Sequence, residues 1–130
     1  MINMVDIISD ALNKIKIYEK NGEKECLIRN SKLLRAIMDT LKKYEYIKDY
    51  SIKKVGKFDY INIILNKRIN EIKTIKPRFA VKLDEYQKYE SRYIPSKDFG
   101  ILIVSTPQGV MSNREAKEKH LGGRLIAFVY

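Results

Sequence analysis

The sequence predicts an α+β fold of two small domains, because helical and strand periodicities alternate in its first half and strand patterns dominate its second half. A chain of 130 residues suits one ordinary domain or two very small ones. We place an N-terminal α/β domain at 1–68 and a C-terminal, mainly β domain with short helices at 69–130. The first domain is predicted as a small α-β-α-β-β sandwich with two helices against a sheet.

Two helices and three strands are predicted in the first half. Asn3 is a suitable N-cap for a first helix, which Asn21 and Gly22 end. Asn30 and Ser31 precede a second helix. The apolar residues at helical spacing are Val5, Ile8, Leu12 and Ile15 in the first helix and Leu34, Ile37, Met38 and Leu41 in the second, with Tyr44 at its end. Strands are expected at 25–29, 46–55 and 58–65, the last two turned at Gly56–Lys57.

The second half alternates strands with short helices. Strands are expected at 70–75, at 78–82 after Pro77, at 101–104 and at 124–130. The apolar strand 101–104 is expected to be buried on both faces. One helix is expected at 83–93. Another begins at the capping box Ser112–Glu115 and ends at Gly122 and Gly123.

The charge balance points to a polyanionic partner. Lys and Arg number 26 against 16 Asp and Glu, which leaves a net charge of +10, while 45% of the residues are apolar. A chain this apolar folds rather than staying disordered. Both halves are basic, with 13 basic and nine acidic residues up to residue 65 and 13 and seven after it. A folded domain with this surplus is stabilised by a partner that neutralises it, such as nucleic acid.

Several classes of protein are disfavoured by residue counts. Cys26 is the only cysteine and His120 the only histidine, so an intrachain disulfide is excluded and a metal site or other cofactor is not expected. The uninterrupted apolar runs are at most six residues long, far short of a membrane span. Residues 1–6 lack the pattern of a secretory signal. We therefore expect a cytoplasmic protein with no membrane association.

The segment from Ser105 to Asn113 is the strongest candidate site. It follows a buried strand, precedes a capped helix and is rich in hydroxyls, with one amide and Gly109. Such groups can meet sugar hydroxyls and base edges in the shallow minor groove of RNA, and a glycine lets a backbone approach a ligand closely. The alternative is an ordinary turn whose hydroxyl caps the next helix.

A catalytic reading of the same segment is disfavoured. Catalysis by this segment would require Ser105 or Thr106 as the nucleophile and His120 as the base. A lone histidine before Gly122 near a helix C-terminus is more often structural, and no nucleophile elbow or phosphate-binding loop accompanies it. We expect no enzymatic activity and no small-molecule substrate.

Small basic groups spread along the chain suggest a surface that contacts phosphate. The best N-terminal candidate is Asn30-Ser31-Lys32, where the free N–H groups of a helix N-terminus and a lysine can meet a phosphate. Lys14, on the first helix, and Arg78, after Pro77, are further candidates.

An ordered set of motifs across the whole chain resembles the universal S-eight family of small-ribosomal-subunit proteins. The matching segments are 3–15, 27–29 with Ser31 and Lys32, 76–79, 94–100, Ser105 and Thr106 with 109–111, 114–116, and 119–123. The Pro77-Arg78-Phe79 and Lys119–Gly123 segments look like the archaeal and eukaryotic branch rather than the bacterial one.

The resemblance implies a primary binder of the central domain of 16S-type ribosomal RNA that helps the platform assemble beside neighbouring ribosomal proteins. It implies that the loop places polar atoms in an RNA minor groove, and that the N-terminal helix and Ser31-Lys32 contact phosphates. Pro107 and Gln108 replace a Ser-Lys pair common in bacterial members. The RNA-binding residues expected from the loop are Ser105, Thr106, Gln108, Gly109, Val110, Met111 and Ser112.

Two other nucleic-acid readings stay open at this stage. One is a translational regulator that binds a messenger RNA mimicking the ribosomal site, as some bacterial relatives do. The other is a DNA-binding or chromatin protein, which would prefer duplex DNA to structured RNA.

Overall fold

The computed structural model describes residues 7–96 and 98–130. The chain divides into two compact units, the first ending at Ile69 and the second running from Asn70 to Tyr130. The sequence pattern predicted this division after residue 68. Asn3 and Val5, predicted as the N-cap and an apolar position of the first helix, and Lys97, inside one of the matching segments, lie outside the described residues.

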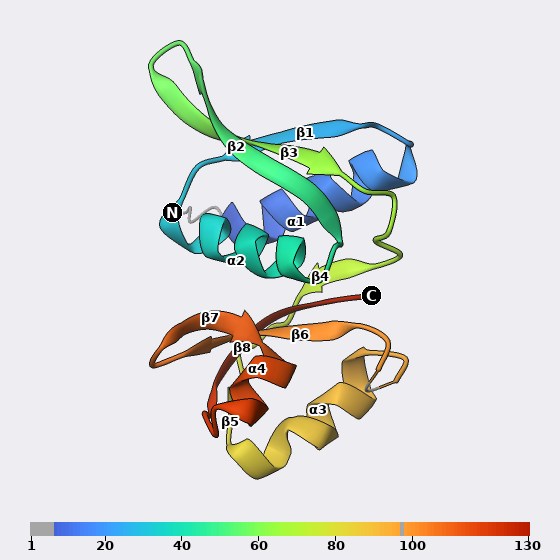
Figure 1. Cartoon of the computed structure of the whole chain (residues 1–130), viewed down its shortest axis with the longest axis vertical. Helices are drawn as coiled ribbons and strands as arrows, with labels where there is room; N and C mark the ends of the chain where they lie inside the picture. Colours follow the sequence, from blue (N-terminus) through green and yellow to red (C-terminus); the bar gives the residue numbers. More distant parts are fainter. Residues whose placement is uncertain (1–6, 97) are drawn as a thin grey trace. The chain divides into compact units, whose positions relative to one another are not determined.

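The N-terminal unit is a three-stranded antiparallel sheet with two helices on one face (Figure 1). Its strand order is β1-β3-β2, so β1 and β2 form the edges. Helix α1 packs against β1, and α2 packs against β2. The elements are α1 (Ile7–Lys20), β1 (Glu25–Arg29), α2 (Lys32–Lys43), β2 (Ile47–Val55) and β3 (Phe58–Leu65).

The core of this unit lies between the helices and the sheet, as the helical spacing predicted. Ile8, Leu12 and Ile15 of α1 are buried, and Tyr44 at the end of α2 is half-buried. Strands β1 and β3 contribute alternate residues, as a pleat with one covered face requires, whereas β2 contributes Ile47. The other buried side chains are Leu34, Ile37, Met38 and Leu41 of α2, with Cys26, Ile28, Ile47, Ile61, Ile63 and Leu65 of the sheet.

The C-terminal unit is an antiparallel sheet with two short helices. Its strand order is β4-β8-β6-β7, and β5 also pairs with β8. Side chains of α3, α4, β6 and β8 share one apolar cluster, so both helices pack on the same face. The elements are β4 (Ile72–Thr74), β5 (Ala80–Val81), a 3-10 turn (Leu83–Glu85), α3 (Tyr86–Tyr93), β6 (Ile101–Thr106), β7 (Gly109–Ser112), α4 (Asn113–Glu118) and β8 (Gly123–Val129). The α+β fold class is thereby confirmed.

Four expectations about strands in the second half needed correction. The strands expected at 70–75 and 78–82 are shorter, because only Ile72–Thr74 and Ala80–Val81 pair with β8. The buried strand extends beyond residue 104 to Thr106. The segment expected to be a loop after it contains a further strand, β7.

No helix in the described part of the chain is both long enough and apolar enough to cross a membrane.

Candidate nucleic-acid interface

The candidate segment is a tight β-hairpin rather than an open loop. Strands β6 and β7 pair antiparallel, with Ser105 opposite Val110 and Thr106 opposite Gly109. Only Pro107 and Gln108 form the turn between them. A two-residue turn fixes the register of both strands, so the position of each exposed group at the tip is set by the sheet.

Thr106 holds this turn with its hydroxyl. Its Oγ1 donates to the carbonyl oxygen of Gly109 at 2.8 Å and accepts from the backbone N–H of Gln108 at 3.2 Å. Gly109 has a φ of +118°, a conformation that side chains disfavour, although the space beside its Cα is open. The hydroxyl and the glycine therefore fix the shape of the tip.

The seven hairpin residues expected to bind RNA differ in exposure. Ser105, Gln108 and Gly109 are exposed and Val110 is half-buried. The other three are buried: Thr106 holds the turn, Met111 belongs to the core cluster, and Ser112 caps α4. The exposed surface of the hairpin is thus formed by a subset of the expected residues, and the buried ones determine its geometry.

A buried polar network anchors the base of the hairpin. Asn113, which is fully buried, accepts through Oδ1 from the backbone N–H of Leu102 at 3.0 Å and donates through Nδ2 to Glu90 of α3. Lys117 of α4 also donates to the Glu90 carboxylate, at 2.6 Å. Since Glu90 is only 4% exposed, these charged contacts offset the cost of burying its charge. The network ties α3, β6 and α4 together where the hairpin begins.

Arg124 is a basic residue beside the hairpin that the sequence analysis did not single out. It is exposed and lies opposite Ser105 in the register of β6 and β8. Its Nη1 lies 3.5 Å from the carbonyl oxygen of Arg78, so the structure brings the predicted Arg78 close to the hairpin. The signal available in the sequence was an isolated arginine at the start of an apolar strand, directly after Gly123.

Gly123 permits this close approach. A Cβ at this position would lie 2.3 Å from the carbonyl oxygen of Ser105 and 2.9 Å from Cγ1 of Val104. Only glycine lets β8 lie against β6 here without displacing backbone. The expectation that the Gly122-Gly123 pair ends the helix was wrong, because α4 ends at Glu118 and the turn at His120 closes it. The pair instead brings Arg124 beside Ser105.

Two of the three N-terminal candidate residues at the start of α2 form hydrogen bonds within the protein. Ser31 is the N-cap, and its Oγ accepts from the backbone N–H of Leu34 at 3.0 Å, as predicted. Asn30 accepts from Arg35 Nη1 at 2.7 Å. Lys32, the first helical residue, is exposed. Of the three candidates, Lys32 is the side chain that presents a charge to solvent at this helix terminus.

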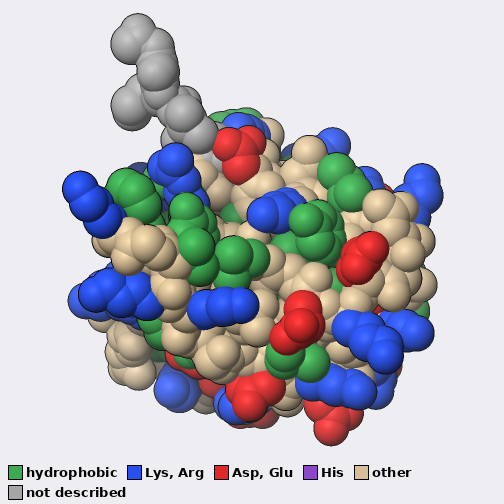
Figure 2. Space-filling view, turned by 90° about the horizontal axis from the view of Figure 1, so that it is seen from above, with side chains coloured by type: hydrophobic (Ala, Val, Ile, Leu, Met, Phe, Trp, Pro, Cys, Tyr) green, Lys and Arg blue, Asp and Glu red, His purple; other side chains and the backbone are tan. Residues whose placement is uncertain are grey.

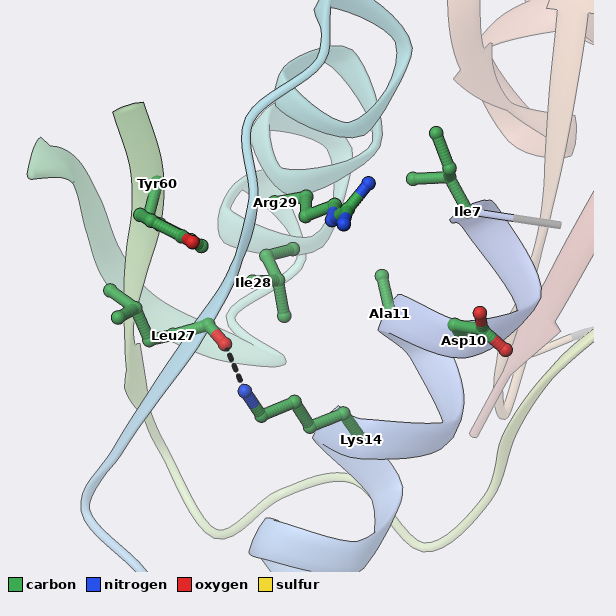
Figure 3. Close-up of a pocket in the computed structure, with 8 residues that line it drawn as sticks. All are labelled: Ile7, Asp10, Ala11, Lys14, Leu27, Ile28, Arg29 and Tyr60. Carbon is green, nitrogen blue, oxygen red and sulfur yellow. Dashed lines mark hydrogen bonds between the residues drawn. The ribbon is translucent and has the colours of Figure 1, made fainter. Parts of the chain in front are cut away.

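Lys14 lies at a pocket of about 310 Å³ between α1 and the edge strand β1 (Figure 3). Its ammonium donates to the carbonyl oxygen of Leu27 at 2.5 Å and lies 5.5 Å from the centre of the Tyr18 ring. The structure does not bring Lys14 and Lys32 to a shared pocket. The lining residues of the pocket are Ile7, Asp10, Ala11, Lys14, Leu27, Ile28, Arg29 and Tyr60.

Acidic, histidine and cysteine side chains do not gather as metal ligands within residues 7–96 and 98–130. His120, the base in the catalytic reading, is exposed and has a φ of +57° in the turn after α4.

Comparison with known proteins identifies relatives of this chain. A family model described as Ribosomal protein S8 matches residues 6–130. The small ribosomal subunit protein uS8 of Thermoplasma volcanium is 41% identical over 126 residues, which are 96% of this chain and 98% of that protein. The protein of the same name from Thermoplasma acidophilum is 40% identical over the same shares of both chains.

Proposed function

Since this chain belongs to the ribosomal protein S8 family, a structural family without enzymatic activity, we propose that it binds the RNA of the small ribosomal subunit through the β6–β7 hairpin. The RNA partner is a helix in the central domain of the 16S-type molecule. The protein binds it early, as a primary binder in the cytoplasm, and helps the platform assemble beside neighbouring ribosomal proteins. The relatives from Thermoplasma agree with the archaeal branch expected from the Pro77–Phe79 and Lys119–Gly123 segments.

The preorganised, uncharged hairpin tip is the observation that carries this proposal. Ser105, Gln108 and Gly109 present a hydroxyl, an amide and an open backbone to solvent, while Thr106 uses its hydroxyl to hold their geometry. The minor groove of an RNA helix is wide and shallow and displays 2′-hydroxyls that donate and accept hydrogen bonds. A rigid tip loses little entropy on binding, so its hydrogen bonds contribute more to affinity.

Basic side chains beside the tip supply contacts that do not depend on RNA sequence. Arg124 lies next to Ser105 in the sheet, and Arg78 lies next to Arg124. Such residues contact phosphates and set the register of the protein on the duplex, while the hairpin reads shape and hydroxyl positions. This division accounts for a neutral tip in a protein with a net charge of +10.

The proposal is tested by measuring the affinity of single variants for a stem-loop taken from the central domain of the small-subunit RNA. Ser105→Ala removes an exposed hydroxyl from the tip and should weaken binding by about 1 kcal/mol, roughly fivefold. Thr106→Val should weaken binding by a similar amount, because the turn loses both hydrogen bonds of its hydroxyl.

Ser91→Ala is the matched control, because Ser91 is an exposed serine on α3 of the same unit. Its affinity should equal that of the unmodified protein. Unchanged affinity of both hairpin variants, measured with folded protein, would show that RNA is read elsewhere.

A further inference from the structure

The face of the N-terminal sheet opposite the helices has a regular arrangement of side chains. Both helices pack on one face of the sheet, and alternate residues of each strand point to the other face. Figure 2 looks onto this side of the unit and shows apolar side chains lying among lysines and arginines. We call this surface the open sheet face and define it by its three cross-strand rows, which are Arg29–Tyr60–Lys53, Leu27–Asn62–Ser51 and Glu25–Ile64–Asp49.

The three rows differ in charge. In the first row, Tyr60 lies directly opposite Arg29 on one side and Lys53 on the other. Directly opposite residues on one face have Cβ atoms about 5 Å apart, so Lys53 lies beside Tyr60 on this face, while the Arg29 side chain extends from the edge strand toward α1 (Figure 3). The third row holds two carboxylates, Glu25 and Asp49, beside Ile64. An anion is therefore attracted to the first row and repelled by the third, which orients an elongated anionic ligand on the face.

A second aromatic ring lies on the same face of β3. Phe58 and Tyr60 are two residues apart in one strand, so their side chains point to the same side, about 7 Å apart along the strand. Phe58 is 67% exposed, the largest exposure among the large apolar residues of the described chain, and Tyr60 is half-buried. Two rings at this spacing on an open sheet are suited to stacking successive nucleobases, since a base presents a flat π-face whatever its identity.

The pocket beside β1 continues this surface around the edge of the sheet. Figure 3 shows Arg29 pointing from β1 toward Ala11 and Ile7 of α1, with Tyr60 across the strand. Lys14 adds a further positive charge on the α1 side. With two cations, Arg29 and Lys14, against the one carboxylate of Asp10, the pocket offers a place for a phosphate at the edge of the face that carries Tyr60.

We propose that the open sheet face binds unpaired nucleotides of RNA, with two bases stacked on Phe58 and Tyr60 and their phosphates held by Arg29 and Lys53. The proposal deepens the RNA-binding function proposed above and rests on it, but it uses a different unit and a different form of RNA. Single strands are recognised by stacking and backbone charge, whereas the β6–β7 hairpin is suited to a helical groove. A protein partner is disfavoured because the aromatic residues lie near Lys53 and the basic edge of the sheet rather than in an apolar patch.

The test uses the full chain and a fluorescein-labelled single-stranded RNA of six uridines, with affinity followed by anisotropy. Phe58→Leu and Tyr60→Leu keep an apolar side chain in β3 but remove the aromatic ring. Each should weaken binding about fivefold or more, the loss expected for one stacked base. Phe99→Leu is the matched control, because Phe99 is a 51% exposed phenylalanine in the C-terminal unit. Arg29→Ala should weaken binding, while Lys48→Ala, at the acidic end of the sheet, should not.

A second measurement does not depend on variants. A hexamer carrying 5-iodouridine is crosslinked to the unmodified protein by light, and the attachment site is mapped by mass spectrometry. The crosslink is expected in the tryptic peptide 58–67, which holds both rings. A crosslink confined to other peptides, or equal affinity of the two ring variants and the Phe99 control, would overturn the proposal.

The central-domain stem-loop separates this proposal from the function proposed above. If the stem-loop binds normally and the hexamer does not bind, only the role of the open sheet face is wrong. If neither RNA binds the folded protein, the RNA-binding function itself fails. If an acidic peptide of equal charge binds as tightly as the hexamer and shows the same dependence on both rings, the face is a protein-docking surface and the nucleotide proposal is wrong.

Discussion

The two units each carry a hairpin with a two-residue turn, but the two hairpins expose different kinds of side chain. The β2–β3 hairpin turns at Gly56–Lys57 and exposes lysines and Phe58 on its arms. The β6–β7 hairpin turns at Pro107–Gln108, and its tip carries no formal charge within the described strands and turn. The same local backbone design therefore presents charge and aromatic surface in one unit and oriented neutral polar groups in the other.

The difference lies in where the polar groups of each hairpin are satisfied. In the β6–β7 hairpin, Thr106 and Ser112 use their hydroxyls on backbone groups of the protein, so the tip is rigid before any ligand arrives. In the β2–β3 hairpin, Lys53 and Lys54 extend into solvent. Mobile cations on long side chains give affinity that falls with salt, whereas fixed dipoles select a shape.

The largest effect is expected from Gly123→Ala, which tests whether β8 supports the neutral hairpin. The added Cβ would meet the carbonyl oxygen of Ser105 at 2.3 Å, so backbone must move. Overpacking of this kind should lower the free energy of unfolding of the C-terminal unit by about 3 kcal/mol. Hydrogen exchange should show loss of protection in β6, β7 and β8 that exceeds any loss in β1–β3.

Gly56→Ala is the control for this substitution in the other hairpin. A Cβ on Gly56 would meet nothing within 4 Å, but its φ of +63° is left-handed. Strain alone should cost about 1 kcal/mol. Equal destabilisation by the two variants would mean that the contact between β8 and Ser105 is not a tight one.

A decrease of intermediate size in the free energy of unfolding is expected at high pH. It concerns the N-terminal unit, because this unit holds the single thiol of the chain, Cys26. Burial raises the pKa of Cys26 from 9.0 to about 11, with Lys14 nearby opposing the shift. Between these values the unfolded chain loses the proton while the folded one keeps it, so the unfolded state binds fewer protons and stability falls as pH rises. The stabilisation is complete below pH 9, and about 1.4 kcal/mol of it is lost by pH 10.

Chemical denaturation at pH 7 and pH 10 measures this loss against Cys26→Ala. The variant removes the thiol, so its own decrease between the two pH values should be smaller by about 1.4 kcal/mol. Tyr50, whose pKa is raised to about 12 mainly by its hydrogen bond to Asp39, is present in both proteins and cancels in the comparison. Parallel pH profiles of the two proteins would show that Cys26 is accessible to solvent.

Periodicity was sufficient to predict most of the fold, and the reason is visible in α2 and β3. The spacing of Leu34, Ile37 and Leu41 leaves one orientation that buries them, and the alternation of Ile61, Ile63 and Leu65 does the same for a strand. Strand β7 was missed because its four residues pair only with β6 and lack an alternating pattern of their own. Short strands depend on a partner that a local pattern does not reveal.

The candidate site was only partly predictable for a different reason. A hydroxyl in the sequence looks the same whether it faces solvent, as Ser105 does, or holds a turn, as Thr106 does. Arg124 becomes part of the site only through its register with Ser105, which joins residues 19 positions apart. Tyr60 lies in a strand that the sequence predicted, but only its cross-strand pairing places it on the open sheet face.

The smallest expected effect is a change in the salt dependence of RNA affinity, and it distinguishes contacts made by charged side chains from contacts made by neutral ones. Lys32 is exposed at the start of α2, so Lys32→Ala should remove one phosphate contact. Affinity for the central-domain stem-loop, measured from 50 to 400 mM salt, should then fall with a slope lower by about 0.7 to 0.9 in log–log form. Ser105→Ala should shift the whole line downward without changing its slope, because a hydroxyl releases no counterion. If the slope instead falls with Ser105→Ala and stays constant with Lys32→Ala, the neutral hairpin acts by positioning cations, and the division between charged contacts and neutral shape readout is wrong.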